Sequence, residues 1–251
     1  MGKSKKDSLG DRMKNSYENR TRHYLPRRTY TIIRLDGKAF HTFTRGLKKP
    51  FDVGFVVDMT HTAQHLVNNI QGAQFAYVQS DEISILLTDF NTITTDAWFD
   101  GNIQKICSVS ASLATAKFNN LRIQRCENYP VEEIDFIKQK LAYFDSRVFT
   151  IPDPIEVENY FIWRQKDWYR NSVNMVGQSH YSHKELHGKK INEVLDMIHL
   201  KGDNWNNYDD VLKNGTVVTK DDFTGKIIFT KDRESLRGNL IPTFTTGDSD
   251  E

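Results

Sequence analysis

The stretch from residue 30 to residue 87 constrains the fold of this chain more than any other part. It contains three runs rich in β-branched, aromatic and aliphatic residues, and an amphipathic helical segment separates the first run from the second. The three runs are residues 30–35, 75–78 and 83–87. This order predicts a β-α-β-β unit in which the second and third strands form a hairpin.

Acidic residues lie at two ends of these strands. Asp36 and Gly37 end the first strand, while Asp81 and Glu82 lie at the tip of the hairpin. If the first and third strands are neighbours, carboxylates from distant parts of the chain converge at one edge of the sheet. A few oxygen ligands that leave room for substrate phosphates are what a pair of Mg²⁺ ions requires. The alternative is two surface turns, because Asp-Gly and Ser-Asp are common turn sequences.

Five segments that occur in a fixed order carry a family resemblance. They are R-L-D-G-K-A-F-H (34–41), K-K-P-F-D (48–52), Q-S-D-E (79–82), F-D-S-R-V (144–148) and W-R-Q-K-D (163–167). Together they resemble the tRNA-histidine guanylyltransferase family, whose members add nucleotides in the reverse, 3′-to-5′ direction. The resemblance extends from about residue 11 to about residue 215. It implies a polymerase-like palm domain with two Mg²⁺ ions and a nucleoside triphosphate in its active site.

The predicted architecture is an α/β (α+β) fold. We expect a palm with an antiparallel β-sheet built on the β-α-β-β core and backed by helices, plus a small C-terminal region of helices and a hairpin. Residues 1–150 are the expected palm-like catalytic domain with an N-terminal basic arm, and residues 151–251 the expected helical and hairpin region that holds tRNA. No linker separates the two parts, so we expect one integrated unit.

Individual elements follow from the spacing of apolar residues. Along the first strand, Thr31, Ile33 and Leu35 share the face that is the better candidate for the core. The segment after it carries apolar residues at helical spacing, which predicts a helix packed on the sheet. Those residues are Val56, Met59, Ala63, Leu66 and Ile70. Two further helices are expected at 96–118 and 155–175, and a terminal hairpin with strands at 216–218 and 227–229.

The resemblance also implies the residues of the active site. Asp36, Asp81 and the Gly37 carbonyl would bind the metal ions, with Glu82 supporting this catalytic group. The implied nucleotide-binding residues are Asp36, Gly37, Lys38, Ala39, Phe40, His41, Lys49, Asp52, Ser80, Asp81, Lys105 and Arg147.

Several of these residues have an ordinary structural alternative. His41 would otherwise be a packed or surface histidine, and Lys49 and Asp52 would belong to a charged surface loop. Lys105 would be an exposed helix lysine. Arg147 lies inside a strand pattern and needs an anionic partner, which is either a phosphate or a carboxylate of the protein.

The predicted tRNA-binding residues come from three places in the sequence. They are Arg27, Arg28, Tyr169, Arg170, Asn171 and Lys190. The first two belong to an arm in which arginines alternate with aromatic residues, a composition suited to phosphate contact and base stacking. The alternative for this arm is a solvated linker whose tyrosines pack on the sheet. Tyr169 stands where the eukaryotic branch of the family has histidine, and the surrounding pattern is similar to the bacterial and archaeal guanylyltransferase-like branch.

Composition narrows the remaining functional classes. Charged residues make up 27% of the chain and its formal net charge is +1, so any RNA contact must depend on local patches. No apolar run approaches the length of a bilayer span, and the Lys-rich start lacks a secretory apolar core, so we expect a cytoplasmic protein without membrane contact. Cys107 and Cys126 lack metal-ligand spacing, and the His61 and His65 pair has no third ligand nearby, so structural roles are expected.

The predicted function is template-dependent 3′-to-5′ addition of nucleotides to the 5′ end of tRNA, which is 5′-end repair by two-metal nucleotidyl transfer. ATP would activate 5′-monophosphate ends, and GTP or other nucleoside triphosphates would be added. The resemblance further implies a homotetramer. Three alternatives stay open: strict G−1 addition to histidine tRNA, a catalytically inactive tRNA-binding protein, and a nucleotide cyclase on the same palm.

Overall fold

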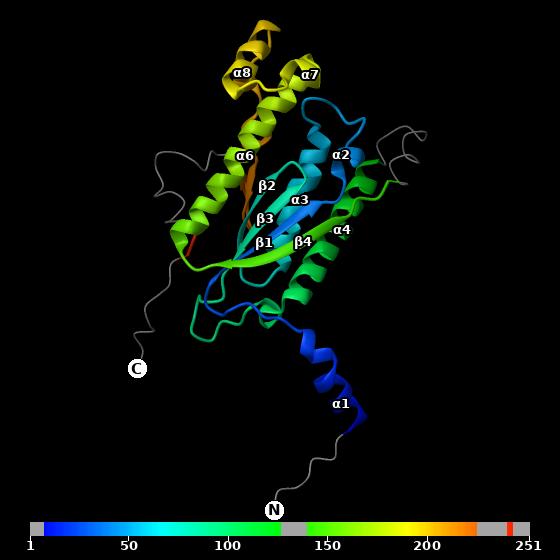
Figure 1. The fold of residues 1–251 in the computed structure, drawn as a ribbon, viewed down its shortest axis with the longest axis vertical. Helices are drawn as coiled ribbons and strands as arrows, with labels where there is room; N and C mark the ends of the chain where they lie inside the picture. The colour runs from blue at the N-terminus through cyan, green and yellow to red at the C-terminus, as the bar shows by residue number, and fades with distance from the viewer. Residues whose placement is uncertain (1–7, 127–139, 225–239, 243–251) are drawn as a thin grey trace, which may run out of the picture.

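The computed structural model describes residues 8–126, 140–224 and 240–242 (Figure 1). A six-stranded sheet lies at its centre in the order β4-β1-β3-β2-β5-β6, and every neighbouring pair is antiparallel. The strands are β1 (Tyr30–Gly37), β2 (Ala73–Gln79), β3 (Glu82–Leu87), β4 (Phe144–Ile151), β5 (Thr216–Val218) and β6 (Phe223–Thr224). A helix joins β1 to β2, and β2 and β3 form a hairpin, so the predicted β-α-β-β core is confirmed.

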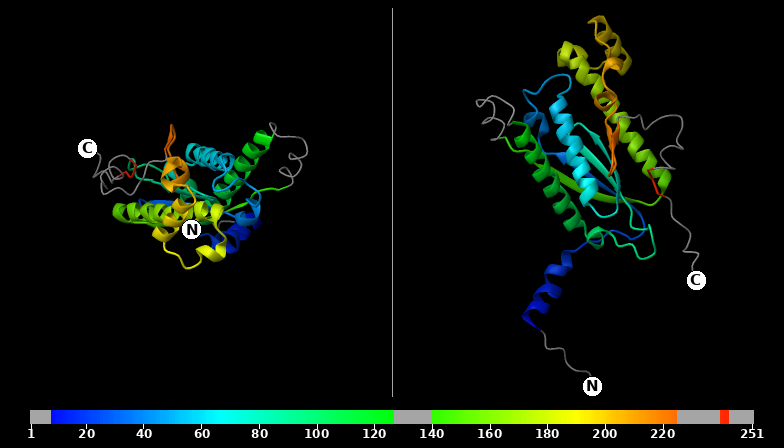
Figure 2. Two further views of the ribbon diagram at one scale, coloured as in Figure 1. Left: turned by 90° about the horizontal axis from the view of Figure 1, so that it is seen from above. Right: turned by 180° about the vertical axis from the view of Figure 1, so that it is seen from behind.

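Helices cover both faces of the sheet, as the view along the sheet in Figure 2 shows. One face carries α3 (Val53–Asn69) and α4 (Ile103–Cys126), and the other carries α6 (Pro154–His180). The shorter helices are α1 (Leu9–Ser16), α2 (Phe40–Phe43), α7 (His183–Leu186), α8 (Ile191–Leu200) and α9 (Asp210–Lys213). Single 3₁₀ turns are η1 (Glu18–Thr21), η2 (Trp98–Gly101) and η3 (Trp205–Asn207). Among the described helices, none is both long and apolar enough to cross a membrane.

Burial of β1 differs from the expectation that one face alone forms the core. Ile33 and Leu35 pack under α3 and α4 as predicted, but Tyr30 and Ile32 on the opposite face are equally buried against α6. The second cover comes from a helix more than a hundred residues later in the sequence, which the pattern of β1 alone does not reveal. Only the last part of this face, from Arg34 onward, is polar.

Two helix boundaries differ from those predicted. The helix expected from residue 96 begins instead at Ile103, because Phe99 and Asp100 have left-handed backbone angles that a helix cannot contain. The helix expected at 155–175 runs from Pro154 to His180. Its first turn is fixed by Asp153, whose carboxylate accepts hydrogen bonds from the N–H groups of Ile155 and Glu156.

The second strand of the terminal hairpin begins earlier than predicted. It begins at Phe223, because Thr219 and Asp222 close a tight turn through mutual hydrogen bonds. The predicted strand 227–229 lies outside the described residues. Since β5 pairs with β2, residues on both sides of the expected boundary near residue 150 contribute to one sheet.

Candidate active site

A row of four side chains crosses the sheet where β1 ends. Residues paired in register point to the same face of a sheet. Asp36 is paired with Asp145 of β4 and with Glu82 of β3, and Glu82 is paired in turn with Gln79 of β2. This polar row (Asp145, Asp36, Glu82, Gln79) lies on the face covered by α6. Three neighbouring carboxylates repel one another, which favours cations at this end of the sheet.

The turn between β2 and β3 holds the hairpin tip against the end of β1. Ser80 adopts a left-handed conformation with φ of 49°, and the Gly37 N–H donates a hydrogen bond of 3.1 Å to the Asp81 carbonyl. A Cβ on Gly37 would lie 2.3 Å from the ring of Phe40, which is buried under the sheet. Glycine at position 37 therefore allows Phe40 to anchor the loop beneath the carboxylates.

The environment of Asp81 disfavours a free carboxylate. Burial raises the pKa of the Asp81 carboxyl to about 6, and the negative charges of Asp36 and Glu82 act in the same direction. Hydrogen bonds from Ser80 and from the backbone N–H of Asp81 itself offset part of this effect. A cation bound between Asp36 and Asp81 would relieve the repulsion.

The donor set suits a hard divalent cation whose remaining ligands come from a substrate. Two carboxylates and the nearby Gly37 carbonyl supply few protein oxygens, which matches the way Mg²⁺ binds nucleotide phosphates. Across the described ranges, no group of three or more His, Cys, Asp or Glu residues could hold a metal ion by itself. A cation at Asp36 and Asp81 thus depends on further ligands outside the protein side chains.

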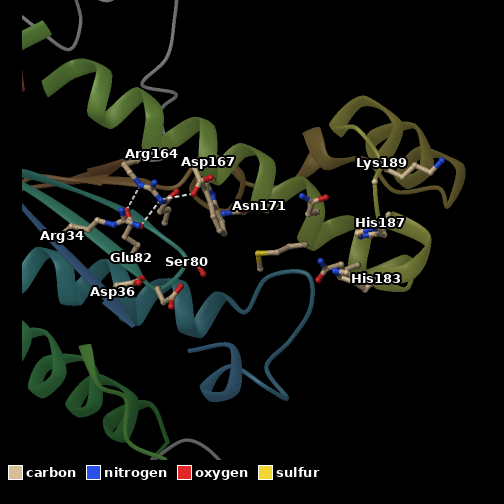
Figure 3. Close-up of a pocket in the computed structure, with 18 residues that line it drawn as sticks. Arg34, Asp36, Ser80, Glu82, Arg164, Asp167, Asn171, His183, His187 and Lys189 are labelled. Atoms are coloured by element: carbon tan, nitrogen blue, oxygen red, sulfur yellow. Dashed lines mark hydrogen bonds and ion pairs between the residues drawn. The ribbon is translucent and has the colours of Figure 1, made fainter. Parts of the chain in front are cut away.

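Glu82 has a different role from its two acidic neighbours. Its carboxylate is buried and accepts hydrogen bonds from Arg34 and from Arg164 of α6, the latter at 2.8 and 2.9 Å (Figure 3). Arg164 also contacts Asp167 at 3.0 Å and lies over the ring of Trp163. Two arginines therefore neutralise Glu82 and tie the hairpin to α6.

A pocket of about 640 Å³ opens above the polar row, between the end of the sheet and the second half of α6 (Figure 3). This volume lies within the range of pockets that enclose a nucleotide-sized ligand. The residues of its walls include Arg34, Asp36, Ser80, Asp81, Arg164, Asp167, Asn171, His183, His187 and Lys189. Asp36, Ser80 and Asp81, which the sequence places in the nucleotide site, are thus brought together at one wall.

The loop after β1 continues along the same end of the sheet. The Lys38 N–H donates to the Tyr143 carbonyl at 2.8 Å, and Ala39 takes a left-handed conformation that starts α2. No described residue accepts a hydrogen bond from the N–H groups of Ala39, Phe40 and His41, which leaves them able to contact an anion. The Phe40 side chain is packed in the core, so only its backbone can reach a ligand.

The loop that contains Lys49 and Asp52 is ordered by the aspartate. Asp52 begins α3, where its carboxylate accepts hydrogen bonds from the N–H groups of Phe55 at 2.8 Å and Lys48 at 3.2 Å. Asp52 also lines a small, mainly apolar cavity of about 40 Å³ that reaches Ser80. The structure does not place Lys49 in the wall of either cavity.

Neither Lys105 nor Arg147 lines the two cavities, and only Arg147 contacts a carboxylate of the polar row. Lys105 is in the first turn of α4, with its ammonium group over the Phe99 ring at 5.7 Å. Thr115 bonds to the Phe144 N–H beside the end of β1, and Lys105 lies ten residues earlier, about 15 Å farther along the helix. Arg147 has a carboxylate partner, because its guanidinium contacts Asp145 at 3.2 Å.

The predicted tRNA-binding residues are separated in space. Arg27 and Arg28 precede β1, at the far end of the sheet, where the Arg27 guanidinium and the Arg28 backbone N–H donate hydrogen bonds to the Asp89 carboxylate. Tyr169 packs edge-on against Trp205, and Arg170 contacts Asp167 at 2.8 Å. Lys190 is exposed at the start of α8, next to Lys189 of the pocket wall. Of the six, only Asn171 lines the large pocket.

A polar stripe on α6, which was not predicted from the sequence, forms one wall of the pocket. Its members are Arg164, Asp167, Asn171, Asn174 and Gln178. They follow one another at intervals of three or four residues, which is the spacing of one helix face. This spacing is visible in the sequence. It would have been sufficient to predict that these five polar residues share one face of the helix.

Comparisons with known proteins are consistent with this site. The family described as "tRNAHis guanylyltransferase" matches residues 10–152. A bacterial tRNA(His) guanylyltransferase-like protein in complex with ATP has 42% sequence identity and a TM-score of 0.82, over 93% of this chain and 99% of that one. A bacterial protein of the same description in complex with GTP has 39% identity and a TM-score of 0.75, with the same coverage. An uncharacterized protein of Acanthamoeba polyphaga mimivirus is 32% identical over 233 residues, which are 85% of this chain and 77% of that protein.

These findings confirm the palm-like fold predicted from the β-α-β-β pattern. They also confirm the branch inferred from the residues around Tyr169, since the two bacterial guanylyltransferase-like structures match nearly the whole chain. The chain therefore belongs to the nucleotidyltransferases of the tRNA-histidine guanylyltransferase family, in their bacterial guanylyltransferase-like branch.

Proposed function

We propose that this enzyme adds nucleotides to the 5′ end of tRNA in the 3′-to-5′ direction, under the control of the opposite strand of the acceptor stem. The observation that carries the proposal is the meeting of Asp36 and Asp81 at the wall of a 640 Å³ pocket. Family membership supports the same chemistry. Truncated tRNA ends are the proposed substrate, because the chain belongs to the guanylyltransferase-like branch.

The transfer breaks a phosphoanhydride bond at the RNA 5′ end and forms a phosphodiester bond. The 3′-hydroxyl of the incoming nucleotide loses its proton and bonds to the phosphorus at the RNA 5′ end. A 5′-triphosphate end releases pyrophosphate in this step. A 5′-monophosphate end first reacts with ATP, which releases pyrophosphate and leaves an adenylylated end whose AMP is displaced by the same hydroxyl. ATP and GTP are both proposed ligands, in line with the two bacterial structures.

Asp36, Asp81 and the Gly37 carbonyl would hold two Mg²⁺ ions in this scheme. When bound, the ions acidify the attacking hydroxyl and neutralise phosphate charge. The raised pKa of Asp81 supports this assignment, because an unneutralised carboxylate is unfavourable there. The N–H groups of Ala39, Phe40 and His41 would hold the triphosphate, beside Ser80 at the pocket wall.

The remaining residues of the pocket orient the substrates. Arg34 and Arg164 fix Glu82, and through it the hairpin that carries Asp81. The polar stripe of α6, with Asn171 at its centre, faces the same pocket and would contact the RNA end. Arg170 and Lys190 at the outer surface would extend this contact along the acceptor stem. A homotetramer, as the family resemblance implies, would bring further copies to one tRNA.

The test is an addition assay with Mg²⁺, ATP and all four nucleoside triphosphates. A 5′-truncated tRNA and an intact histidine tRNA are compared, each with wild type, Asp36→Asn and Asp145→Asn. Asp145 belongs to the same polar row but lies outside the pocket wall, so it controls for loss of one charge. We expect wild type to extend the truncated tRNA up to the paired end, Asp36→Asn to lose this activity, and Asp145→Asn to keep most of it.

Other outcomes of the assay favour the alternatives. Faster addition of one G to intact histidine tRNA would favour strict G−1 addition. A cyclic product formed from nucleotides without RNA would favour a cyclase. Binding of tRNA that is unaffected by Asp36→Asn, with no addition by wild type, would favour a catalytically inactive binding protein.

A further inference from the structure

Gln79 is a buried amide in the wall of the active-site pocket, and its carbonyl oxygen accepts no hydrogen bond from the residues that the structure describes. It is the last residue of β2, its side chain is 4% exposed, and its Oε1 has no hydrogen-bond partner among the described residues. Most buried polar side chains in folded proteins are hydrogen-bonded, because an unsatisfied one loses its contact with water without compensation. An unpaired amide at this place therefore indicates a partner that arrives with the ligand.

The polar row places Gln79 at a defined distance from the carboxylates. Gln79 is paired with Glu82 and is two strands away from Asp36, which corresponds to roughly 10 Å across the sheet. This separation is comparable to the length of a nucleoside. A nucleotide whose phosphates lie at Asp36 is therefore long enough to bring its base to Gln79.

The surroundings of Gln79 favour the base edge over other parts of a nucleotide. Gln79 lines both the large pocket and the 40 Å³ cavity, whose other walls include Phe51, Phe55, Met59 and Trp168. The 40 Å³ cavity is too small for a base, but Trp168 also lines the large pocket, where an aromatic side chain suits the flat face of a base. An amide carries an acceptor beside a donor, which complements the adjacent donors and acceptors on a base edge, whereas phosphates carry acceptors only.

We propose that the Gln79 amide binds the base edge of the nucleoside triphosphate held at Asp36 and Asp81. The proposal rests on the proposed function, since it assumes that a nucleotide occupies this pocket. Gln79 then orients the base and thereby the 3′-hydroxyl, while the carboxylates hold the phosphates. Its unsatisfied amide lowers the stability of the nucleotide-free protein and is compensated in the complex.

The experiment replaces the amide with an apolar side chain of similar size and separates base binding from phosphate binding. Wild type and Gln79→Leu are titrated by calorimetry, in the presence of Mg²⁺, with a non-hydrolysable GTP analogue, a non-hydrolysable ATP analogue and inorganic tripolyphosphate. Gln74→Leu is the matched control: it changes the same residue type in the same strand, but Gln74 is bonded to Gly72 and Thr88 at the opposite end. Thermal unfolding of each nucleotide-free variant is measured in parallel.

We expect Gln79→Leu to weaken at least one nucleotide about three- to tenfold, the effect of one lost hydrogen bond, and to leave tripolyphosphate affinity unchanged. The nucleotide-free variant should unfold at a higher temperature than wild type, because it no longer buries an unsatisfied amide. Gln74→Leu should unfold at a lower temperature and bind every ligand as wild type does.

Three results would overturn the proposal. They are unchanged nucleotide affinity in Gln79→Leu, an equal loss of tripolyphosphate affinity, and a lower unfolding temperature, which would show that the amide is satisfied in the free protein. The binding experiment with Gln79→Leu and the tRNA addition assay can fail independently of each other. A wild-type protein that binds nucleotides through Gln79 but never extends tRNA would contradict the proposed reaction and leave the role of Gln79 intact.

Discussion

Asp36 lies directly opposite Glu82 in the register between β1 and β3, yet only Glu82 is neutralised by arginines. Arg34 and Arg164 bind both oxygens of Glu82, whereas no cation among the described residues forms an ion pair with Asp36. Two adjacent carboxylates thus have different roles. Glu82 holds the site together, and Asp36 is left to bind something that the protein does not supply.

This difference predicts opposite effects of two similar substitutions. Glu82→Gln leaves Arg34 without its carboxylate partner and Arg164 with Asp167 alone, and we expect a loss of about 3–5 kcal/mol in the free energy of unfolding. Asp36→Asn removes a repelling charge, so we expect unchanged or slightly higher stability together with loss of nucleotide addition. Urea unfolding and the addition assay measure the two effects. Equal destabilisation by both variants would contradict the division of roles.

The raised pKa of Asp81 predicts a pH dependence of stability in the metal-free protein. Its folded-state pKa of about 6 exceeds the ordinary value of 3.8, so the folded protein binds the proton more tightly. The resulting stability is present below pH 3.8 and is lost as the pH rises toward 6. Each pKa unit corresponds to about 1.4 kcal/mol, so we expect Asp81→Asn to be more stable than wild type by up to about 3 kcal/mol above pH 7.

Urea unfolding in EDTA between pH 4 and pH 8 checks this prediction. The advantage of Asp81→Asn should shrink as the pH falls from 7 to 4. Addition of Mg²⁺ at pH 8 should stabilise wild type more than the variant, if the ion binds at this carboxylate. A constant difference between the two proteins across the pH range would show that Asp81 is not perturbed by its surroundings.

Gly37 provides a third prediction, which concerns packing. In Gly37→Ala the new methyl group would overlap the Phe40 ring, so the ring or the loop must move. We expect a loss of about 1–3 kcal/mol of stability and a large loss of activity, because the same loop sets the position of the N–H groups after β1. Gly10→Ala is the control, since a Cβ at Gly10 meets nothing within 4 Å. The double variant Gly37→Ala, Phe40→Ala should recover part of the activity, and full additivity would argue against the overlap.

The sequence was sufficient to predict the centre of this site. Alternating strands and a turn at residues 80 and 81 placed Asp36 and Asp81 at one edge of the sheet, because antiparallel pairing of β1 with β3 leaves few other arrangements. The five family segments then identified the chemistry. These inferences depend on local pattern and on short connections, which a sequence expresses directly.

The parts that could not be predicted depend on contacts between distant residues. Glu82 and Arg164 are separated by 82 positions, and the cover of Tyr30 and Ile32 comes from the same helix, α6. Lys105 lies in the first turn of α4, because the left-handed conformations of Phe99 and Asp100 delay the start of this helix to Ile103. Likewise, an unsatisfied amide at Gln79 becomes visible only when every neighbour of that side chain is known.

The polar stripe of α6 carries the last prediction. Asn171 is the middle residue of this stripe and lines the pocket. Asn171→Ala therefore removes an amide that we expect to contact the RNA end. The tRNA KM should rise about three- to tenfold, the effect of one hydrogen bond, while KM for the nucleoside triphosphate stays the same. Asn159→Ala on the same helix is the control, because Asn159 lies about 18 Å from Asn171 along the axis and bonds to Glu156. A rise in KM for nucleotide alone would place Asn171 in the nucleotide site, and equal effects of both variants would argue that α6 acts only as structural support.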